Sequence, residues 1–570
     1  MQLNSTFFVK TTFAIFATFV IHIALYAPRG TGLYFANNSL TWLTMSVLIG
    51  LGFWNLSKTK TFSFTSFIYF IAAGSILLFI PMLYSNANLL SILPRFVGFL
   101  GGVLLFISLY QLKLNLKCKF DILFILLLGI AIESSLGMLQ LFLNDVLMLS
   151  GTSYELLNNR PSGVFRQPNV MASFMATGIA MSFMLTFYKP ELGYDVKRSF
   201  LIKYSIFSCA LVLVTLQSKT GYLGAIFSLL LFIPIFVKKF SHYKSILLLL
   251  FIGLFVGILT LNLMQGSARG EKLYDDGGVR IDIITTSLSL YKEEPLLGHG
   301  YGNFERKYLE THYKQMAIDP ELKAPVVNLD HPHNEYLLWS TEGGIVALLG
   351  LIIISIGGLL IFKGKVNLEK IALLSLCIPI LLHTQTEKPF YLSAVHFLYF
   401  ITLLWFIDEK LNQVTSHKVK SFLLAKVTAV IVPILVIPFM LTAIHTSVKV
   451  SNFIASDYKK TEYLSDIVNH MAWQGYFEEF YNNIKFYDAL SSNNYEHLNE
   501  YIVWSYAYLQ TTPRAHLYEN LILSIIYLEK NNYKIDQSFK NKVYAEARNL
   551  YPKRQVWGDV EQAKKLINSP

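Results

Sequence analysis

Long apolar segments recur along the first 444 residues of this chain and constrain its fold more than any other feature. A helix needs roughly 20 apolar residues to cross the hydrocarbon core of a bilayer, and each segment has about that length. Only 15% of the residues are charged, whereas soluble domains carry about a quarter. The sequence therefore predicts an all-α polytopic membrane protein with about thirteen transmembrane helices. The segments lie near residues 11–27, 40–56, 64–83, 91–110, 121–143, 169–188, 200–217, 220–237, 244–264, 335–362, 367–383, 390–408 and 422–444.

Basic residues occupy every second loop between these segments. Examples are the groups around Lys113, Lys197, Lys238 and Lys363, while the short loops between basic groups are nearly uncharged. Cytoplasmic loops of membrane proteins are enriched in Lys and Arg, so this alternation predicts a cytoplasmic N-terminus and, after about thirteen spans, a C-terminus on the far side. The net charge of +11 follows from this orientation, and no nucleic-acid partner is expected.

Two long hydrophilic segments face the non-cytoplasmic side in this topology. The loop 265–334 is rich in Gly, Asp and charged residues, and we expect it to form a structured unit or a lid. In the tail 445–570, aromatic and aliphatic residues recur at helical spacing, as in "YIVWSYAYLQ" and "LYENLILSIIYLEK". We therefore predict a transmembrane catalytic domain over 1–444 and a C-terminal helical, tetratricopeptide-like domain over 445–570, although no clean repeat of about 34 residues is present.

Polar residues gather at the ends of spans on the predicted outer side, and their chemistry suits one kind of reaction. Arginine offers a planar fork for phosphate oxygens, and histidine can take the proton of an attacking hydroxyl near neutral pH. Diphosphate leaves readily once cations neutralise its charge. The pattern predicts transfer from a lipid-linked pyrophosphate to an acceptor arriving from outside. The candidates are Arg160, Arg166, Lys219, Arg280, His331, His333, Asn334, His383 and Glu387.

Most of these residues also have a simpler explanation. Arg160, Arg166 and Lys219 can be interfacial anchors that reach the lipid headgroups, and Arg280 can lie at the start of a solvated loop helix. His331 and His333 can hold zinc, but no third ligand stands at a recognisable spacing. These alternatives stay open at the level of the sequence.

Further polar residues have structural interpretations. Asp330 or Asn334 can cap the helix that begins near Glu335. Glu133 lies inside an apolar segment, where an ionisable residue is a candidate for function. The serines beside it favour a hydrogen-bonded structural role instead. His312 is predicted to lie on the surface.

Three stretches of the chain resemble a known family. "DHPHNEYLLWSTEGG", residues 330–344, resembles the His-x-His-Asn signature of the O-antigen ligase and polymerase superfamily. "RPSGVFRQPNVMASFMATGIA" and "HTQTEKPFYLSAVHFLYF" are more similar to the PglL-type bacterial O-oligosaccharyltransferases. The resemblance runs from about residue 120 to at least 400, and the aromatic-rich tail also fits that group.

The resemblance implies a GT-C-like enzyme of the bacterial inner membrane. Such an enzyme takes a glycan from undecaprenyl pyrophosphate and attaches it to Ser or Thr of periplasmic proteins such as pilin, without a nucleotide sugar, a metal or another cofactor. By the resemblance, His333 matches the essential histidine of the family, and Arg280 matches the arginine that precedes "GHGYGNF". The Ser-Arg pair of the family at the end of the seventh span reads Ser218–Lys219 here, and lysine lacks the bidentate fork of arginine.

These inferences combine into one hypothesis for the site. His333 takes the proton of the acceptor hydroxyl in an inverting-type attack, while Arg280, with Lys219 and Arg160 or Arg166, neutralises the pyrophosphate. The long loop closes over donor and acceptor, and the tail receives the protein substrate. The supporting residues of the pocket are expected to be His331, Asn334, His383 and Glu387.

Three other functions remain open. Ligation of O-antigen to lipid A–core, or polymerisation of glycan repeats, uses the same donor with a different acceptor. A transporter or flippase also needs charge in the membrane, but here the polar residues gather at one face and no inverted repeat is evident. A scaffold function would not explain why cations and histidines cluster on one side.

Overall fold

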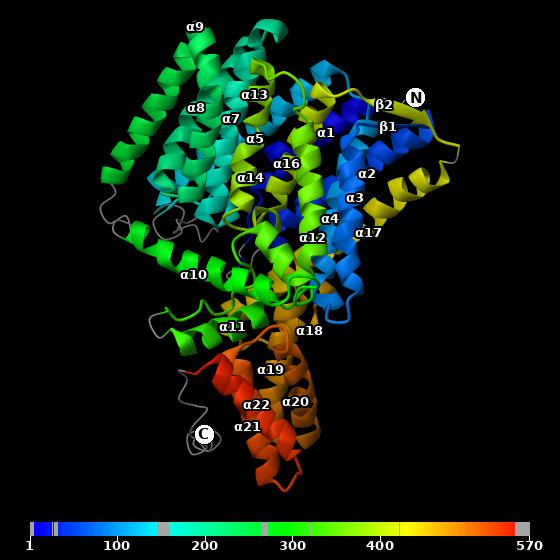
Figure 1. The fold of residues 1–570 in the computed structure, drawn as a ribbon, viewed down its shortest axis with the longest axis vertical. Helices are drawn as coiled ribbons and strands as arrows, with labels where there is room; N and C mark the ends of the chain where they lie inside the picture. Colours follow the sequence, from blue (N-terminus) through cyan, green and yellow to red (C-terminus); the bar gives the residue numbers. More distant parts are fainter. Residues whose placement is uncertain are drawn as a thin grey trace. The chain divides into compact units, whose positions relative to one another are not determined.

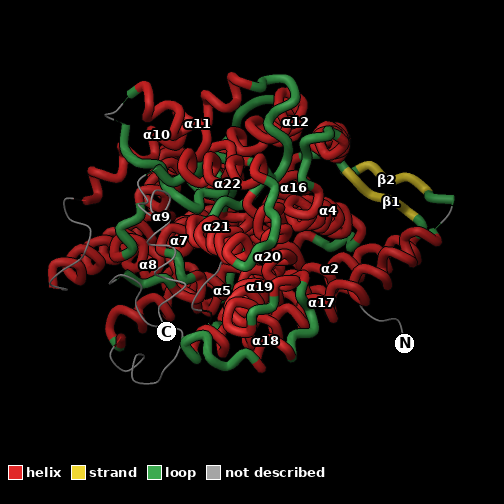
Figure 2. The backbone as a smooth tube through the Cα atoms, turned by 90° about the horizontal axis from the view of Figure 1, so that it is seen from below, coloured by secondary structure: helices red, strands yellow, loops and turns green. Residues whose placement is uncertain are grey.

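The computed structural model describes residues 5–25, 27, 32–144, 160–263, 272–319, 322–420 and 422–552. These residues fold almost wholly into α-helices, together with one short two-stranded sheet (Figure 2). Parts of the predicted loop 265–334 and of the predicted tail 445–570 lie outside the described residues. The chain forms two compact units, and each unit is assembled from separate stretches of sequence.

Helices form over all of the predicted apolar segments. Among the described residues, eight helices are long and apolar enough to cross a membrane, and the shorter apolar helices Thr6–His22 and Phe67–Leu83 cover two further predicted segments. The predicted all-α polytopic membrane fold is confirmed, whereas the count of about thirteen spans stays a prediction. The eight are α2 (Ala36–Thr59), α4 (Leu89–Gln111), α5 (Leu116–Phe142), α7 (Pro168–Leu192), α8 (Val196–Thr215), α9 (Lys219–Leu263), α12 (Glu335–Leu360) and α17 (Leu423–Ala455).

The long helix α9 contains two of the predicted segments, and the chain reverses between them. Its backbone leaves the helical region at Lys239, with φ −129° and ψ 33°. Gly221 in the first half and Gly257 in the second half both contact the 211–214 end of α8. The two halves must therefore run antiparallel, so the predicted reversal near residue 240 is present, although no loop separates the halves.

Helix α7 is the centre of the first unit, which comprises residues 1–74, 94–273 and 352–473. All of its apolar window is buried within the protein, and it packs against α5, α8, α9 and α14 (Figure 1). Its small residues allow this close approach, because helices in membranes associate through small side chains. A Cβ at Gly178, for example, would collide with Ile130 and Cys209. The remaining helices of this unit are α1 (Ser5–Thr18), most of α3 (Phe67–Phe79), α13 (Leu368–Leu374), α14 (Ile378–Thr384), α15 (Pro389–Leu392), α16 (Ala394–Leu411) and α18 (Glu462–Ser465).

Two loops of the first unit pair as a small sheet that the sequence did not predict. Strands β1 (Thr61–Phe64) and β2 (Thr415–Lys418) run antiparallel, with Thr61 opposite Lys418. Gln111 at the end of α4 holds β1 by bonding both backbone groups of Ser63, at 2.9 and 2.7 Å. Strands this short carry little sequence signal, because their pairing depends on contacts distant in the chain.

The second unit joins the two predicted hydrophilic segments, since it comprises residues 75–93, 274–351 and 474–570. The predicted boundary at 444/445 stays a prediction, because compactness does not tell which residues lie in lipid. Within this unit, α19 to α22 follow one another as packed neighbours, and α11 contacts α22. The predicted helical stretches of the tail are confirmed as α20 and α21. The helices are α10 (Lys272–Glu293), α11 (Phe304–Ile318), α19 (Gln474–Ser492), α20 (Tyr495–Leu509), α21 (Ala515–Lys530) and α22 (Gln537–Leu550).

Charged pairs connect α11 to the helices of the tail. Arg306 lies 2.7 Å from Glu310 and 3.1 Å from Glu546 of α22, and Glu305 pairs with Arg514 at the start of α21. Burial by itself lowers the pKa of Arg306, but the neighbouring Tyr518, Glu546 and Glu310 oxygens outweigh it and raise that pKa. The guanidinium therefore stays charged, and these pairs fix how the loop helix lies on the tail.

The prediction that His312 lies on the surface is wrong. Its side chain is buried between α10 and α11, where Nδ1 lies 3.1 Å from Thr286 Oγ1 and Nε2 lies 2.9 Å from the carbonyl oxygen of Lys323. Both ring nitrogens thus have partners, which lets a polar residue occupy the core.

Candidate active site

Glu387 is the centre of a polar network at the N-terminal end of α7. Its Oε1 accepts a hydrogen bond from Asn169 Nδ2 at 2.7 Å, and its Oε2 lies 3.0 Å from Gln167 Nε2 and 3.1 Å from His383 Nε2. Asn169 Oδ1 in turn accepts a bond from Ser218 Oγ at 2.8 Å. The predicted pocket residues Glu387 and His383 are therefore adjacent, and they are connected to the start of α7 and to the corner before α9.

A second layer of buried groups orients His383. Its Nδ1 lies 2.7 Å from Ser173 Oγ, which also lies 3.0 Å from His396 Nε2, and His396 Nδ1 lies 2.9 Å from Ser393 Oγ. The side chains of this layer are fully buried, and that of Glu387 is nearly so. Glu387 Oε2 and Ser173 Oγ thus contact opposite nitrogens of the His383 ring, while Ser173 Oγ donates to the carbonyl oxygen of Val170 at 3.0 Å. These contacts on both sides of the ring fix the orientation of His383.

Two side chains of α5 hold the turn that contains the motif "RPSGVFRQ". Gln140 Oε1 and Glu133 Oε1 together accept hydrogen bonds from the three backbone N–H groups of residues 162–164, at 2.7 to 3.0 Å. The other carboxylate oxygen of Glu133 lies 2.8 Å from His22 Nδ1. The prediction of a hydrogen-bonded structural role for Glu133 is confirmed. Because the two acceptors stand two turns apart on one helix, they fix the direction of the turn as well as its position.

We expect Glu133→Leu to destabilise the first unit by about 3 kcal/mol, because it leaves the Val164 N–H and the His22 ring without their buried acceptor. Thermal unfolding of the purified protein in detergent measures this loss. Glu133→Gln keeps an acceptor oxygen for Val164 and serves as the matched control, with a smaller loss. A leucine variant as stable as the wild type would show that the turn does not depend on this carboxylate.

The predicted cations of the first unit lie next to this turn and to the network around Glu387. Arg166 adopts the left-handed backbone conformation, with φ 52°, and donates from Nη1 to the carbonyl oxygen of Ala27 at 3.0 Å. Arg160 donates to the carbonyl oxygen of Leu216 at 3.4 Å. Lys219 is the first residue of α9, is exposed and makes no ion pair with any described residue. The structure thus brings Arg160, Arg166, Lys219, His383 and Glu387 together in one unit.

His333 and its neighbours occupy the second unit, at the start of α12. His333 has a φ of 57°, in the left-handed region, which is uncommon for residues other than glycine and marks positions held by their surroundings. Asn334 accepts a hydrogen bond from the backbone N–H of Leu337 at 2.9 Å, so it caps the helix as predicted. The backbone is therefore bent at His333, just before a capped helix, and the cap fixes the position of that bend.

His331 supports this histidine from the other side of Pro332. The two imidazole rings lie 4.5 Å apart between centroids, and His331 Nδ1 lies 2.7 Å from Asp330 Oδ1. Over the described residues, no three His, Cys, Asp or Glu side chains are placed to hold a metal ion. Metal independence stays a prediction.

Gly298 of "GHGYGNF" and Gly344 of "TEGG" are explained by direct packing of one backbone on another. Gly344 interrupts α12 with φ 65° and ψ −159°, and Ile345 N–H then bonds the carbonyl oxygen of Pro295 at 2.8 Å. Gly298 has no room for a Cβ, which would lie 2.5 Å from the Glu342 carbonyl oxygen. The Glu342 carboxylate accepts from the backbone N–H groups of the same loop. The helix that begins after His333 is thus joined to the loop before α11.

Arg280 lies in the same unit but not at a helix start. Helix α10 begins at Lys272, so Arg280 stands in its third turn, half-buried. Glycines usually disfavour a helix, but here the helix continues through Gly277 and Gly278. The structure therefore places Arg280, His331, His333 and Asn334 in the second unit.

Several residues of the site were not selected from the sequence. Gln167 and Asn169 stand inside a motif that was quoted, and their amides could have been paired with Glu387 as donors for a buried carboxylate. The sequence gives no comparable signal for Gln140, Ser173 and His396. Each is a polar residue in an apolar helix, and the local sequence is the same whether or not its side chain bonds a neighbour.

Three family models match stretches of this chain. The family described as "Protein glycosylation ligase" matches residues 161–185, which include the turn held by Glu133 and the start of α7. The family described as "O-Antigen ligase" matches residues 204–352, from α8 to α12. The family "Virulence factor membrane-bound polymerase, C-terminal" matches residues 371–562. These ligase families indicate a glycan-transferring enzyme.

One curated relative extends the comparison without naming a function. An uncharacterized protein of Haemophilus influenzae (strain ATCC 51907 / DSM 11121 / KW20 / Rd) is 29% identical over 141 residues, which is 23% of this chain and 33% of the relative. The chain thus matches about a third of the length of that protein. Together, the three family matches and the apolar helices support the assignment of this chain to the PglL-type O-antigen ligase superfamily of multi-pass membrane proteins.

Proposed function

We propose that this protein is an O-oligosaccharyltransferase that transfers a glycan from undecaprenyl pyrophosphate to Ser or Thr of periplasmic proteins such as pilin. The protein lies in the bacterial inner membrane with a cytoplasmic N-terminus, and its active site and C-terminal helices face the periplasm. The observation that carries the proposal is the geometry of His333, which stands in a left-handed conformation directly before the cap of α12. A histidine held in this way suits proton transfer near neutral pH.

The reaction is a displacement at the anomeric carbon of the first sugar. The acceptor hydroxyl oxygen forms a bond to that carbon, while the bond from the carbon to the pyrophosphate oxygen breaks. The hydroxyl proton passes to His333, and lipid pyrophosphate leaves with the bonding electron pair. Attack from the face opposite the leaving group inverts the configuration.

The predicted cations have the chemistry that the leaving group needs. Arg280 can grip phosphate oxygens with its planar fork, while Lys219 provides a point charge. Arg160 and Arg166 flank the turn held by Glu133 and Gln140, so their backbones are fixed before a substrate arrives. Fixed charges stabilise a developing negative charge without reorganising in the transition state.

The match to a protein glycosylation ligase at residues 161–185 favours a protein acceptor. The matches to an O-antigen ligase and to a polymerase favour a second candidate, in which the glycan passes to lipid A–core or to another glycan repeat. Both candidates use the same donor chemistry. They differ in the acceptor alone.

Deleting the gene is expected to remove a glycan mass from Ser or Thr of periplasmic proteins, with lipopolysaccharide unchanged. Glycoproteomics of the periplasm, with and without the gene, measures this directly. Unchanged protein glycosylation together with truncated lipopolysaccharide would support the second candidate and overturn the first.

A further inference from the structure

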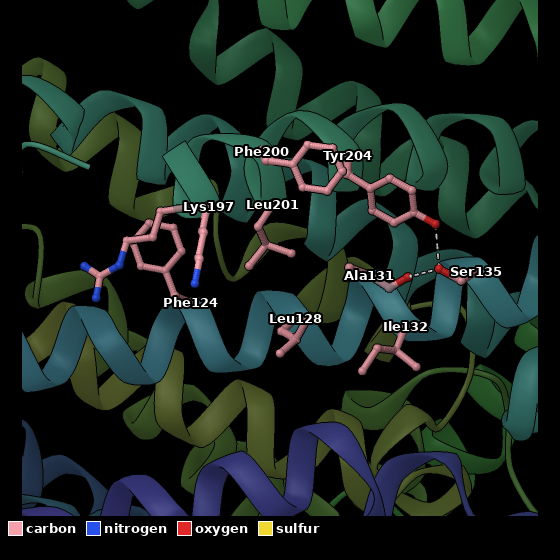
Figure 3. Close-up of a pocket in the computed structure, with 10 residues that line it drawn as sticks. Phe124, Leu128, Ala131, Ile132, Ser135, Lys197, Phe200, Leu201 and Tyr204 are labelled. Carbon is pink, nitrogen blue, oxygen red and sulfur yellow. Dashed lines mark hydrogen bonds between the residues drawn. The ribbon is translucent and has the colours of Figure 1, made fainter. Parts of the chain in front are cut away.

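A groove of about 450 Å³ lies between α5 and α8, apart from the residues of the candidate active site (Figure 3). Ligand pockets have volumes of roughly 300–1,000 Å³. Its residues follow one face of each helix at steps of three and four, so the groove runs along the helices. The lining residues are Phe124, Leu128, Ala131, Ile132 and Ser135 of α5, and Lys197, Arg198, Phe200, Leu201 and Tyr204 of α8.

At one end of the groove the polar side chains are paired within the protein. Ser135 Oγ and Tyr204 OH lie 2.6 Å apart, and Ser135 also donates to the carbonyl oxygen of Ala131 at 2.8 Å. The two hydroxyl groups are thus hydrogen-bonded within the protein. The side chains that line the middle of the groove are apolar. A molecule that fills this part of the groove must itself be apolar.

The other end of the groove is cationic. Arg198 is already engaged, because its Nη2 lies 2.6 Å from Asp121 Oδ1 and its guanidinium lies over the Phe124 ring at 4.8 Å. Lys197 is exposed and has no ion-pair partner among the described residues, and Figure 3 shows its side chain reaching from α8 toward α5. The Asp195 carboxylate caps the start of α8 by accepting from the backbone N–H of Arg198 at 2.8 Å. Asp195 thus binds the helix end and Asp121 pairs with Arg198, which leaves the Lys197 ammonium at the groove to meet an anion.

We propose that this groove binds an anionic phospholipid, with an acyl chain between α5 and α8 and the phosphate at Lys197. Both helices are long and apolar enough to cross a membrane, so the open side of the groove faces acyl chains. From Lys197 to Tyr204 the groove spans about 10 Å of helix, which accommodates part of one chain. Basic pockets between transmembrane helices are typical sites for anionic headgroups. This inference is independent of the proposed catalytic function.

The test uses the full-length protein, purified in neutral detergent and titrated with dioleoyl phosphatidylglycerol or dioleoyl phosphatidylcholine while native mass spectrometry counts the bound lipid. We expect the anionic lipid to bind more tightly. Lys197→Ala should weaken its binding about fivefold, because one basic residue near an anionic surface contributes about that much. Lys203→Ala is the matched control, since Lys203 is exposed on the same helix but does not line the groove.

A second variant tests the apolar part of the site. Leu128→Trp fills the groove and should lower binding of both lipids, with thermal unfolding confirming that the variant is folded. Inorganic phosphate in excess should not displace the lipid, because it gains nothing from the apolar walls. Equal binding of the two lipids, equal effects at Lys197 and Lys203, displacement by phosphate, or full binding to a folded tryptophan variant would each overturn the proposal.

Discussion

Replacing His333 by alanine is expected to abolish glycan transfer while leaving the protein inserted in the membrane. If His333 takes the proton of the acceptor hydroxyl, its removal should lower the rate by about 10²- to 10⁴-fold, the usual contribution of a general base. The side chain is not part of the helix cap, because that bond is made by Asn334. Transfer can be measured by mass spectrometry of a periplasmic acceptor protein after complementation of a deletion strain.

Two variants separate chemistry from backbone strain at this position. Alanine is disfavoured at the φ of 57° found here, whereas asparagine tolerates the left-handed region, so His333→Asn tests the imidazole alone. We expect it to be as inactive as the alanine variant. His417→Ala, at an exposed position of β2, is the control and should be fully active. Normal transfer by His333→Asn would refute the assignment of the base.

Gly344→Ala is expected to destabilise the protein by about 3 kcal/mol or more. The backbone at this position has φ 65° and ψ −159°, a region that is almost exclusive to glycine. An added Cβ would also collide with the carbonyl oxygen of Leu296. Because this break in α12 lets Ile345 bond Pro295, the variant should lose both the kink and the packing of the "GHGYGNF" loop.

Thermal unfolding in detergent, together with the amount of protein in the membrane fraction, measures this effect. Gly358→Ala is a matched control on the same helix, since a Cβ added there would meet no heavy atom within 4 Å. It should be neutral or slightly stabilising, because alanine favours a helix over glycine. If the two variants unfold at the same temperature, the backbone contact at Gly344 is not needed for stability.

The fold was predictable where a signal is local. The apolar segments, the cap at Asn334 and the helices of the tail depend on residues within a few turns of one another, and all three are present. The small sheet, the continuation of α10 through two glycines and the break of α12 at Gly344 were missed. At the sheet and at Gly344, a contact with a distant part of the chain overrides the local preference.

The candidate site divides in the same way. The residue types suited to phosphate and to proton transfer could be selected from the sequence, because their chemistry belongs to the side chain itself. The hydrogen-bond partners of these residues could not be selected from the sequence. Glu387 meets Asn169 across 218 positions of sequence, and Glu133 meets the turn at Val164 across 31, and nothing in the intervening residues encodes either pairing.

The length of the apolar segments and the charges of the loops were sufficient to predict a polytopic membrane protein, and the types of polar residue were sufficient to propose a phosphate-and-histidine chemistry, since each is a property of a short stretch of chain. Tertiary structure alone decided that the segment 274–351 folds with the tail after residue 474, and that Glu133 and Gln140 set the course of the motif before α7. Buried donors and acceptors must be satisfied wherever the fold brings them together, and only the packed helices determine which ones meet.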